Sequence, residues 1–442
     1  MASLVRRASS KLQNVNWSPL WKTEDWWTVW LGTSIMLIAL LKIVTKIPTP
    51  GKWATNPLEA VTVASLWQLI LLGLGIGAIT CLALKFMENK AQKFIIGFPF
   101  LFSLSFLAFL LGRNITFSKY QLDNVIWALV IGLVISNTVG KPKWLAETTR
   151  TELFIKTGLV LLGAEILFNR IMVLGLYGLG VAWLVTPVVF SFMLFLGIKV
   201  LKIESKSLVA TISAATSICG VSAAIAAGSA TRAKKEEIGY AISLSLIFTV
   251  LMMLGMPYII KLVNLGQYVG GALIGGTVDS TGAVVVSGAL LGETAMEIAA
   301  IIKMIQNVLI GIAAFALSYV WVTRVEEREH DSKPTILEVW YRFPKFILGF
   351  VLASAVFSFV LTPMLGTEGV GEILSVTRGM RGWFFCLAFV SIGLETNFSR
   401  LLELGKGGKP VILYIVGQSF NIIMTLIAAL IFFSGRIFPL PM

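Results

Sequence analysis

An aspartate inside a hydrophobic stretch is the residue of this chain best placed to do chemistry. Asp279 lies in GGTVDSTGAVVVSG, within the apolar segment 268–291. An ionisable side chain at membrane depth must face a cavity or a partner, which makes Asp279 a candidate for ion binding. Ser280, Thr281 and Gly282 add hydroxyl and backbone groups of the kind that bind Na⁺ or a substrate. The alternative is that Asp279 only caps a helix that begins at Ser280.

A second segment rich in small residues, 207–230, carries a companion motif, TSICGVSAA. Glycine allows a helix to unwind, and a helix that restarts after Gly220 would direct its first amide groups into the protein. Such a helix end attracts an anionic group. The alternative is ordinary packing of small residues between membrane helices. The candidate substrate-binding residues of this motif are Thr216, Ser217, Cys219, Gly220 and Ser222.

A polar stripe on one apolar helix provides the third group of candidates. Lys303, Gln306 and Asn307 lie in AAIIKMIQNVLIG, and steps of three and four residues place them on one helical face. We expect this face to point inward and to bind substrate, with Lys303 paired to Asp279 or to one of two glutamates, Glu165 and Glu395. The alternative is that Lys303 extends to the membrane interface.

The two glutamates belong to an internal repeat. Residues 161–171 read LLGAEILFNRI and residues 391–401 read SIGLETNFSRL, so Glu165 matches Glu395. Each copy ends an apolar run, where a carboxylate is costly, and a repeat of this kind is typical of secondary transporters. We therefore take both glutamates as candidates for ion coupling. The alternatives are chance similarity and a salt bridge to the arginine five residues further on.

The composition limits the classes of function. Hydrophobic residues make up 57% of the chain, charged residues 13%, and the mean hydropathy is +0.86, which excludes a soluble enzyme domain. The net charge of +13 fits cytoplasmic loops of a membrane protein better than nucleic-acid binding. The single histidine, His330, lies in a charged loop, and the three cysteines show no metal-binding spacing. We expect neither an enzyme nor a metal cofactor.

The hydrophobic segments predict an all-α polytopic membrane protein, with about eleven core segments, inverted-repeat transporter architecture and two added N-terminal helices. Most Lys and Arg residues fall in loops on the same side of the membrane as the N-terminus. This places the N-terminus in the cytoplasm and the protein in the cell (plasma) membrane. This asymmetry improves if segments 207–230 and 268–291 are re-entrant or broken. The predicted divisions are an interfacial N-terminus (1–26), an added helix pair (27–90), and two transporter halves (91–265 and 266–442).

The order of motifs resembles one known family. SICGVSAA, the stretch RAKKEEIGYAISLSLIFTVLMMLGMPYI, the VDST…VVVSG segment and KMIQN are together similar to the sulfate exporter family, also known as an uncharacterised conserved membrane family. The resemblance covers about residues 94–436. It also extends, more distantly, to cation/proton antiporters and bile-acid-type symporters, in which two inverted halves carry crossing helices.

Several residues depart from the family pattern. The family has a histidine at the position of Asp279, an acidic residue at Ser280 and a glutamine at Ala283. It has arginine at the positions of Glu165 and Gln306, and arginine or threonine at Glu395. The Ser-Ile-Cys-Gly motif and Lys303 are kept. Because buried charges select a substrate by its sign, we expect this branch to move something other than free sulfate, or to couple transport to a cation.

Together, these patterns predict a secondary active transporter that moves a small anionic or zwitterionic solute by alternating access. Asp279, with Glu165 or Glu395, would bind the coupling ion, Na⁺ or H⁺, and no other metal or cofactor is expected. The alternatives are a cation/proton antiporter and an ion channel. The expected partners are the solute, the lipid bilayer and, as one option, a second copy of the chain in a homodimer.

Overall fold

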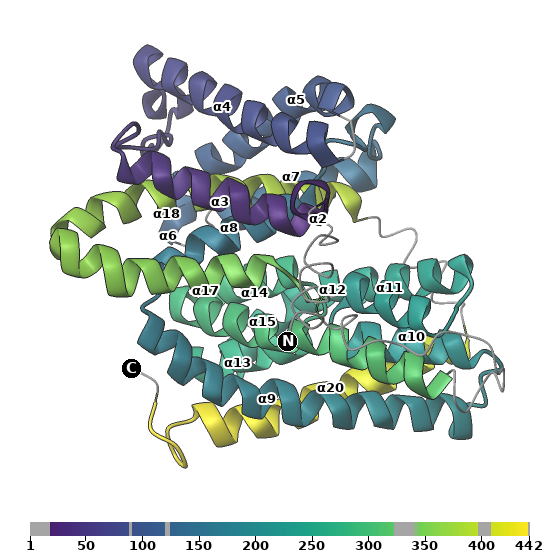
Figure 1. Ribbon diagram of the computed structural model, residues 1–442. Coiled ribbons are helices and arrows are strands. Elements are labelled where there is room, and N and C mark those ends of the chain that lie inside the picture. Colours follow the sequence, from purple (N-terminus) through teal and green to yellow (C-terminus); the bar gives the residue numbers. More distant parts are fainter. Residues whose placement is uncertain are drawn as a thin grey trace, which may run out of the picture.

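The structure, a computed structural model, is built from α-helices. It describes residues 18–87, 91–119, 124–321, 340, 343–396 and 408–440, and this part of the chain contains no β-strand. Seven of its helical stretches are long and apolar enough to cross a membrane. The chain is therefore an all-α polytopic membrane protein, as the sequence predicted. The helices form two bundles that lie one above the other in Figure 1.

The first bundle is drawn from both ends of the chain. Helix α3 packs on α8 and α17, α4 packs on α5, and α18 packs on both α7 and α8. Within α18, near the start of this helix, the chain reverses at Gly366, where φ is 69°. A glycine suits this left-handed conformation. The helices are α3 (Glu24–Leu40), α4 (Val63–Met87), α5 (Ala91–Gly112), α7 (Asn124–Thr138), α8 (Thr151–Glu165), α17 (Phe346–Val356) and α18 (Thr362–Glu395), with short α2 (Pro19–Lys22) and α6 (Ile115–Lys119).

The second bundle holds the polar motifs. Helix α9 packs on α15 and α20, and α12 packs on α10, α11 and α14. The polar-stripe helix, α15, is the most buried of the seven apolar stretches. The helices are α9 (Phe168–Phe195), α10 (Lys206–Ser217), α11 (Gly220–Ala230), α12 (Lys235–Leu262), α13 (Gln267–Thr277), α14 (Thr281–Leu291), α15 (Glu293–Val320) and α20 (Lys409–Phe433).

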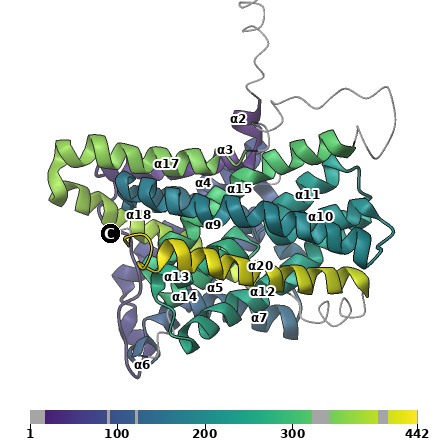
Figure 2. The same ribbon diagram turned by 90° about the horizontal axis from the view of Figure 1, so that it is seen from below.

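Both segments rich in small residues are broken in the middle. The distribution of Lys and Arg between the two sides of the membrane favoured this option over two simple spans. The first divides into α10 and α11 around Cys219, whose backbone is extended, and the second into α13 and α14 around Val278 and Ser280. Helices α10 and α11 pack against each other, so this segment is a helical hairpin. Figures 1 and 2 place the α10–α11 hairpin toward one end of the molecule and the α13–α14 hairpin toward the other.

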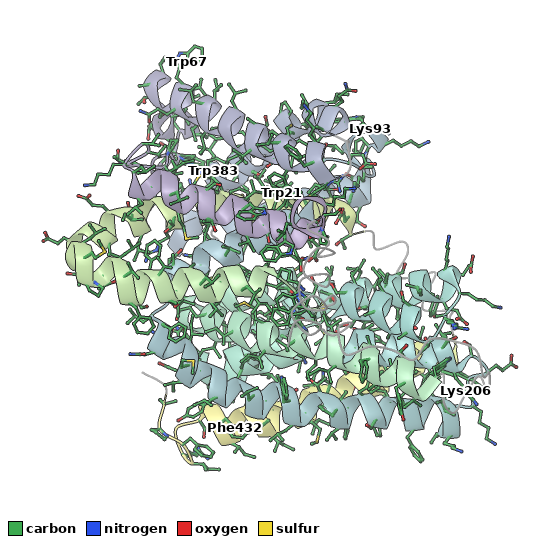
Figure 3. All side chains as sticks on the ribbon, in the orientation of Figure 1. Trp21, Trp67, Lys93, Lys206, Trp383 and Phe432 are labelled. Atoms are coloured by element: carbon green, nitrogen blue, oxygen red, sulfur yellow. The ribbon has the colours of Figure 1, made fainter. Side chains whose placement is uncertain are left out.

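Two labelled lysines identify one end of the molecule. Lys93, at the start of α5, and Lys206, at the start of α10, lie at the same end (Figure 3). We call this the basic end. Helices α3, α8 and α17 also begin there, and α9 and α15 begin at the opposite end (Figure 1). The hairpins thus enter from opposite ends, and their tips meet between them.

The repeated glycines mark close helix packing in the first bundle. A Cβ atom on Gly163 of α8 would lie 2.3 Å from the carbonyl oxygen of Phe350 in α17. One on Gly393 of α18 would lie 2.6 Å from the carbonyl oxygen of Leu129 in α7. The two copies of the repeat therefore make equivalent contacts, α8 with α17 and α18 with α7. The predicted division into sequence halves at residue 265 remains a prediction, and the spatial bundles follow a different grouping.

Candidate functional site

Four helix ends converge where the hairpin tips meet. The carboxyl-terminal ends belong to α10 and α13, and the amino-terminal ends to α11 and α14. The backbone N–H of Gly220 donates a hydrogen bond to the carbonyl oxygen of Asp279 at 3.2 Å, which joins the two tips directly. Nearly all of this backbone is buried. Irregular backbone at membrane depth is stable only where protein groups or water satisfy it.

Lys303 and Gln306 satisfy the carbonyl groups at the ends of α10 and α13. Lys303 Nζ donates to the carbonyl oxygen of Ile218 at 2.6 Å and to Gln306 Oε1 at 2.8 Å. Gln306 Nε2 in turn donates to the carbonyl oxygens of Ser217 at 2.9 Å and Gly276 at 3.2 Å. A cation is favourable beside a helix C-terminus because the carbonyl dipoles point toward it. Among the described residues no ion pair joins Lys303 to Asp279, Glu165 or Glu395, so this pairing stays a prediction.

Two amides of α20 complete this capping. Gln418 Nε2 donates to the carbonyl oxygen of Thr277 at 2.6 Å. Asn421 Nδ2 lies 3.4 Å from the carbonyl oxygen of Gly276 and 3.5 Å from that of Thr216. Neither residue was predicted from the sequence, although an amide pair at i and i+3 in the apolar C-terminal segment is the same signal as the stripe on α15.

Asp279 is buried beside the hairpin tips, and only one of its carboxylate oxygens is satisfied. Oδ2 accepts a hydrogen bond from Ser245 Oγ at 2.7 Å and another from the Tyr414 hydroxyl. Oδ1 has no hydrogen-bond partner within the described part of the chain. Helix α14 begins two residues after Asp279, with Ser280 as its N-cap. Neither Ser245 nor Tyr414 was predicted, because they come from α12 and α20.

A cavity of about 310 Å³ approaches the amino-terminal ends of α11 and α14. Ser222, Thr281 and Asn307, three of the predicted substrate-binding residues, line it. Asn307 Nδ2 donates to Thr281 Oγ1 at 3.1 Å, and Asn307 Oδ1 has no partner among the described residues. The N-cap residues Cys219 and Ser280 make no side-chain capping bond. The first amides of both helices therefore lack the usual side-chain cap.

The cavity lies between the bundles and extends toward the basic end. Asp25 of α3, Glu152 and Lys156 of α8, and Phe346 of α17 line it, all near the first turns of helices that begin at that end. Lys156 Nζ lies 2.8 Å from Asp25, 3.4 Å from Glu152 and 3.8 Å from Glu24. This cluster was not predicted, although Lys156 is a cation within an apolar run.

Glu165 and Glu395 are held in ion pairs away from Asp279. Glu165 pairs with Arg381 at 2.9 Å and Arg378 at 3.1 Å, at the end opposite the basic end. Glu395 pairs with Lys141 at 3.3 Å and accepts a hydrogen bond from Thr149. No described contact joins either glutamate to Asp279. Their assignment to ion coupling stays a prediction, while the alternative partner Arg400 lies outside the described residues.

The other predicted residues support the breaks without lining the cavity. Thr216 and Ser217 direct their hydroxyls to the carbonyl groups of their own helix, at Ile212 and Ser213. Gly220 is a close contact, because a Cβ atom there would lie 2.4 Å from Ser245 Oγ. Gly282 faces the first bundle, and a Cβ atom there would lie 3.2 Å from side-chain atoms of α8 and α18. Cys219 is a buried free thiol.

Two broken helical segments that meet inside a helical bundle define a polytopic membrane protein. Residues 96–414 match the family described as conserved hypothetical protein 698. The chain belongs to this family of conserved membrane proteins.

Three relatives are named as UPF0324 membrane proteins. A UPF0324 membrane protein from Rhodopirellula baltica is 51% identical over 87% of this chain and 71% of its own length. One from Nitratidesulfovibrio vulgaris is 47% identical over 86% and 66%, so this chain spans slightly less than two thirds of it. One from Nitrosomonas europaea is 30% identical over 89% and 92%. No solved structure matches the chain.

Proposed function

We propose that the protein is a secondary active transporter that moves a small zwitterionic or anionic solute by alternating access. The observation that carries this proposal is the cavity of about 310 Å³ between the bundles, which extends from the basic end to Thr281 at the tip of a broken helix. Its volume suits a small molecule. Broken helices that present their ends to a central site are typical of secondary transporters.

The cavity lining favours a solute that carries both signs of charge. At the inner end, Ser222, Thr281 and Asn307 offer hydroxyl and amide groups beside two helix N-termini, which suit an oxyanion or a carboxylate. At the mouth, Asp25 and Glu152 share the Lys156 ammonium, and these carboxylates suit a substrate ammonium. A zwitterion fits both ends, so we favour it over free sulfate.

We propose Asp279 as the coupling residue and H⁺ as the coupling ion. Ser245 and Tyr414 both donate to Oδ2, so Oδ1 remains to take a proton. Protonation removes a charge that is costly at this depth. Na⁺ prefers several oxygen ligands, and one carboxylate oxygen with two hydroxyls already committed to its neighbour is a poorer site. The tests of solute binding and transport should therefore compare the effect of Na⁺ with the effect of pH.

An ion-pair cluster supports closure at the opposite end. Arg381 of the first bundle lies 3.9 Å from Glu293 of the second, and it also pairs with Glu165. Arg170 and Glu297 of the second bundle pair beside it at 3.2 Å. The cavity extends toward one end while charges join the bundles at the other, which is the arrangement expected of one state of an alternating-access cycle.

Orientation and symmetry complete the proposal. The basic end would face the cytoplasm of a cell with the protein in its plasma membrane, by the positive-inside rule. The matched contacts of Gly163 and Gly393 support an inverted repeat that relates α7–α8 to α17–α18. We expect no enzymatic activity.

A ligand panel tests the binding site. Thermal unfolding of the purified protein would be followed with amino acids, aminosulfonates, sulfate and other small anions, with and without Na⁺, because a ligand that binds the folded state stabilises it. We expect a zwitterion to stabilise the protein, and Thr281→Val and Asn307→Leu to remove the effect. The control is Thr80→Val, since Thr80 is also buried but bonds only within its own helix. Equal stabilisation of all four proteins would contradict the site.

A further inference from the structure

A second hollow, separate from the proposed transport site, lies among the N-terminal helices. It is a groove of about 930 Å³ formed by α3, the segment that links α3 to α4, α4 itself and part of α18. Its wall is apolar along the helices, with Ile35 and Ile38 from α3, Leu72 and Ile79 from α4, and Met380 from α18. We call it the α3–α4 groove.

One end of the α3–α4 groove is cationic. Lys46 and Lys52, in the linking segment, and Arg113, at the end of α5, line it, and its described lining contains no carboxylate. Thr49 and Ser65 add hydroxyl groups at the same end, and Arg113 lies within 3.4 Å of Thr49 Oγ1. Three cations without a counter-charge in an apolar groove would be balanced by an anion that carries an apolar body.

The groove has the length of one lipid leaflet. Ser65 and Ile79 are fourteen residues apart on α4, or roughly 21 Å at the rise of an α-helix. Half of a bilayer, headgroup included, measures about 20–22 Å. The polar end lies where α3 ends and α4 begins, and the apolar wall runs along α4 from there. We infer that this end marks the membrane boundary, because α4 is long and apolar enough to span a membrane. Trp67, also near the start of α4, projects outward from the bundle (Figure 3).

We propose that the α3–α4 groove binds an anionic phospholipid, with its phosphate beside Lys46, Lys52 and Arg113 and an acyl chain along α4. Basic pockets between membrane helices recognise anionic headgroups in this way. The lipid would fill the gap between the added N-terminal helices and α18. This site is independent of the transport proposal, because it shares no lining residue with the central cavity.

Lipid binding by the detergent-purified protein, measured by native mass spectrometry, tests the proposal. Dioleoyl phosphatidylglycerol is compared with dioleoyl phosphatidylcholine, and glycerol phosphate serves as the headgroup alone. We expect tighter binding of the phosphatidylglycerol than of either comparison ligand. Each of Lys46→Gln, Lys52→Gln and Arg113→Gln should weaken it roughly fivefold. Lys42→Gln is the matched control, since Lys42 pairs with Glu372 and does not line the groove.

A second variant fills the groove without changing its charge. Gly75 lines it, and a Cβ atom there would meet nothing within 4 Å, so Gly75→Phe should fold and exclude the acyl chain. Gly255→Phe is its control, at an equally open position on α12. Unchanged phosphatidylglycerol binding in Gly75→Phe, or equal binding of both lipids by the wild-type protein, would overturn the proposal. Equally tight binding of glycerol phosphate would also overturn it, by identifying a phosphate site.

Discussion

The backbone N–H of Gly220 and the carbonyl oxygen of Asp279 form a hydrogen bond of 3.2 Å between the tips of two hairpins. The two residues are far apart in the sequence and come from helices that enter the molecule from opposite ends. This bond connects Asp279, the candidate for ion coupling, directly to the first turn of α11. A proton at Asp279 and a solute beside α11 would therefore act on the same piece of backbone.

The contact at Gly220 is tight enough to test by adding a single methyl group. Gly220→Ala places a Cβ atom 2.4 Å from Ser245 Oγ, and relieving that overlap must displace Ser245 or the hairpin tip. We expect the free energy of unfolding in detergent to fall by about 1–3 kcal/mol. Gly239→Ala is the control, because an added Cβ atom there meets nothing within 4 Å. Equal stability of the two variants would contradict the tight packing of the tips.

Replacing Lys303 tests its role as a cap for α10. Lys303→Met keeps the length of the side chain but leaves the Ile218 carbonyl and Gln306 Oε1 without their buried donor. We expect a loss of about 1–3 kcal/mol in unfolding free energy. Lys206→Met is the control. Lys206 is exposed at the start of α10, so this change should alter stability little. A Lys303→Met protein as stable as the wild type would show that the cap contributes nothing.

The charge at the mouth of the cavity should discriminate between classes of solute. Glu152 lines the cavity and its side chain is 41% exposed, so its charge is partly screened. Glu152→Gln should weaken binding of a zwitterion by roughly two- to fivefold. Binding of an anion without an ammonium group should stay equal or improve. A parallel loss for both classes, measured by ligand-induced thermal stabilisation, would argue against an ammonium at the mouth.

The ion pairs at the opposite end should hold the bundles in the present state. Arg381→Gln removes the bridge to Glu293 and should shift the population away from the state with the cavity open toward the basic end. Ser222→Cys, in a chain with Cys81→Ala, would report this as slower labelling by a thiol reagent. Lys42→Gln, which breaks a fully surface ion pair, serves as the control. An unchanged labelling rate would contradict a closing role for Arg381.

The breaks in the membrane segments could be predicted because they follow from residue type. Gly220 and the glycines around Asp279 favour unwinding, and the small residues beside them leave lipid contact to other helices. Burial of Asp279, Lys303 and Asn307 followed from the cost of polar groups in hydrocarbon. Local chemistry was sufficient for these features.

The partners of those residues could not be predicted, because they come from distant elements. Lys303 had three carboxylates as expected partners, yet it binds a helix C-terminus, whose charge comes from backbone geometry and not from any residue type. Ser245 and Tyr414 reach Asp279 from α12 and α20 only through tertiary packing. The repeat at Glu165 and Glu395 predicted matching positions, and the matching contacts are made by the neighbouring glycines.

Coupled accumulation of the stabilising solute by proteoliposomes tests the central claim most directly. The wild-type protein should accumulate the solute when a pH gradient is imposed, and a Na⁺ gradient alone should not replace it. Asp279→Asn should still bind the solute but lose gradient-driven accumulation, because it cannot exchange a proton at Oδ1. Accumulation by Asp279→Asn with the same dependence on the pH gradient as the wild type would contradict the account.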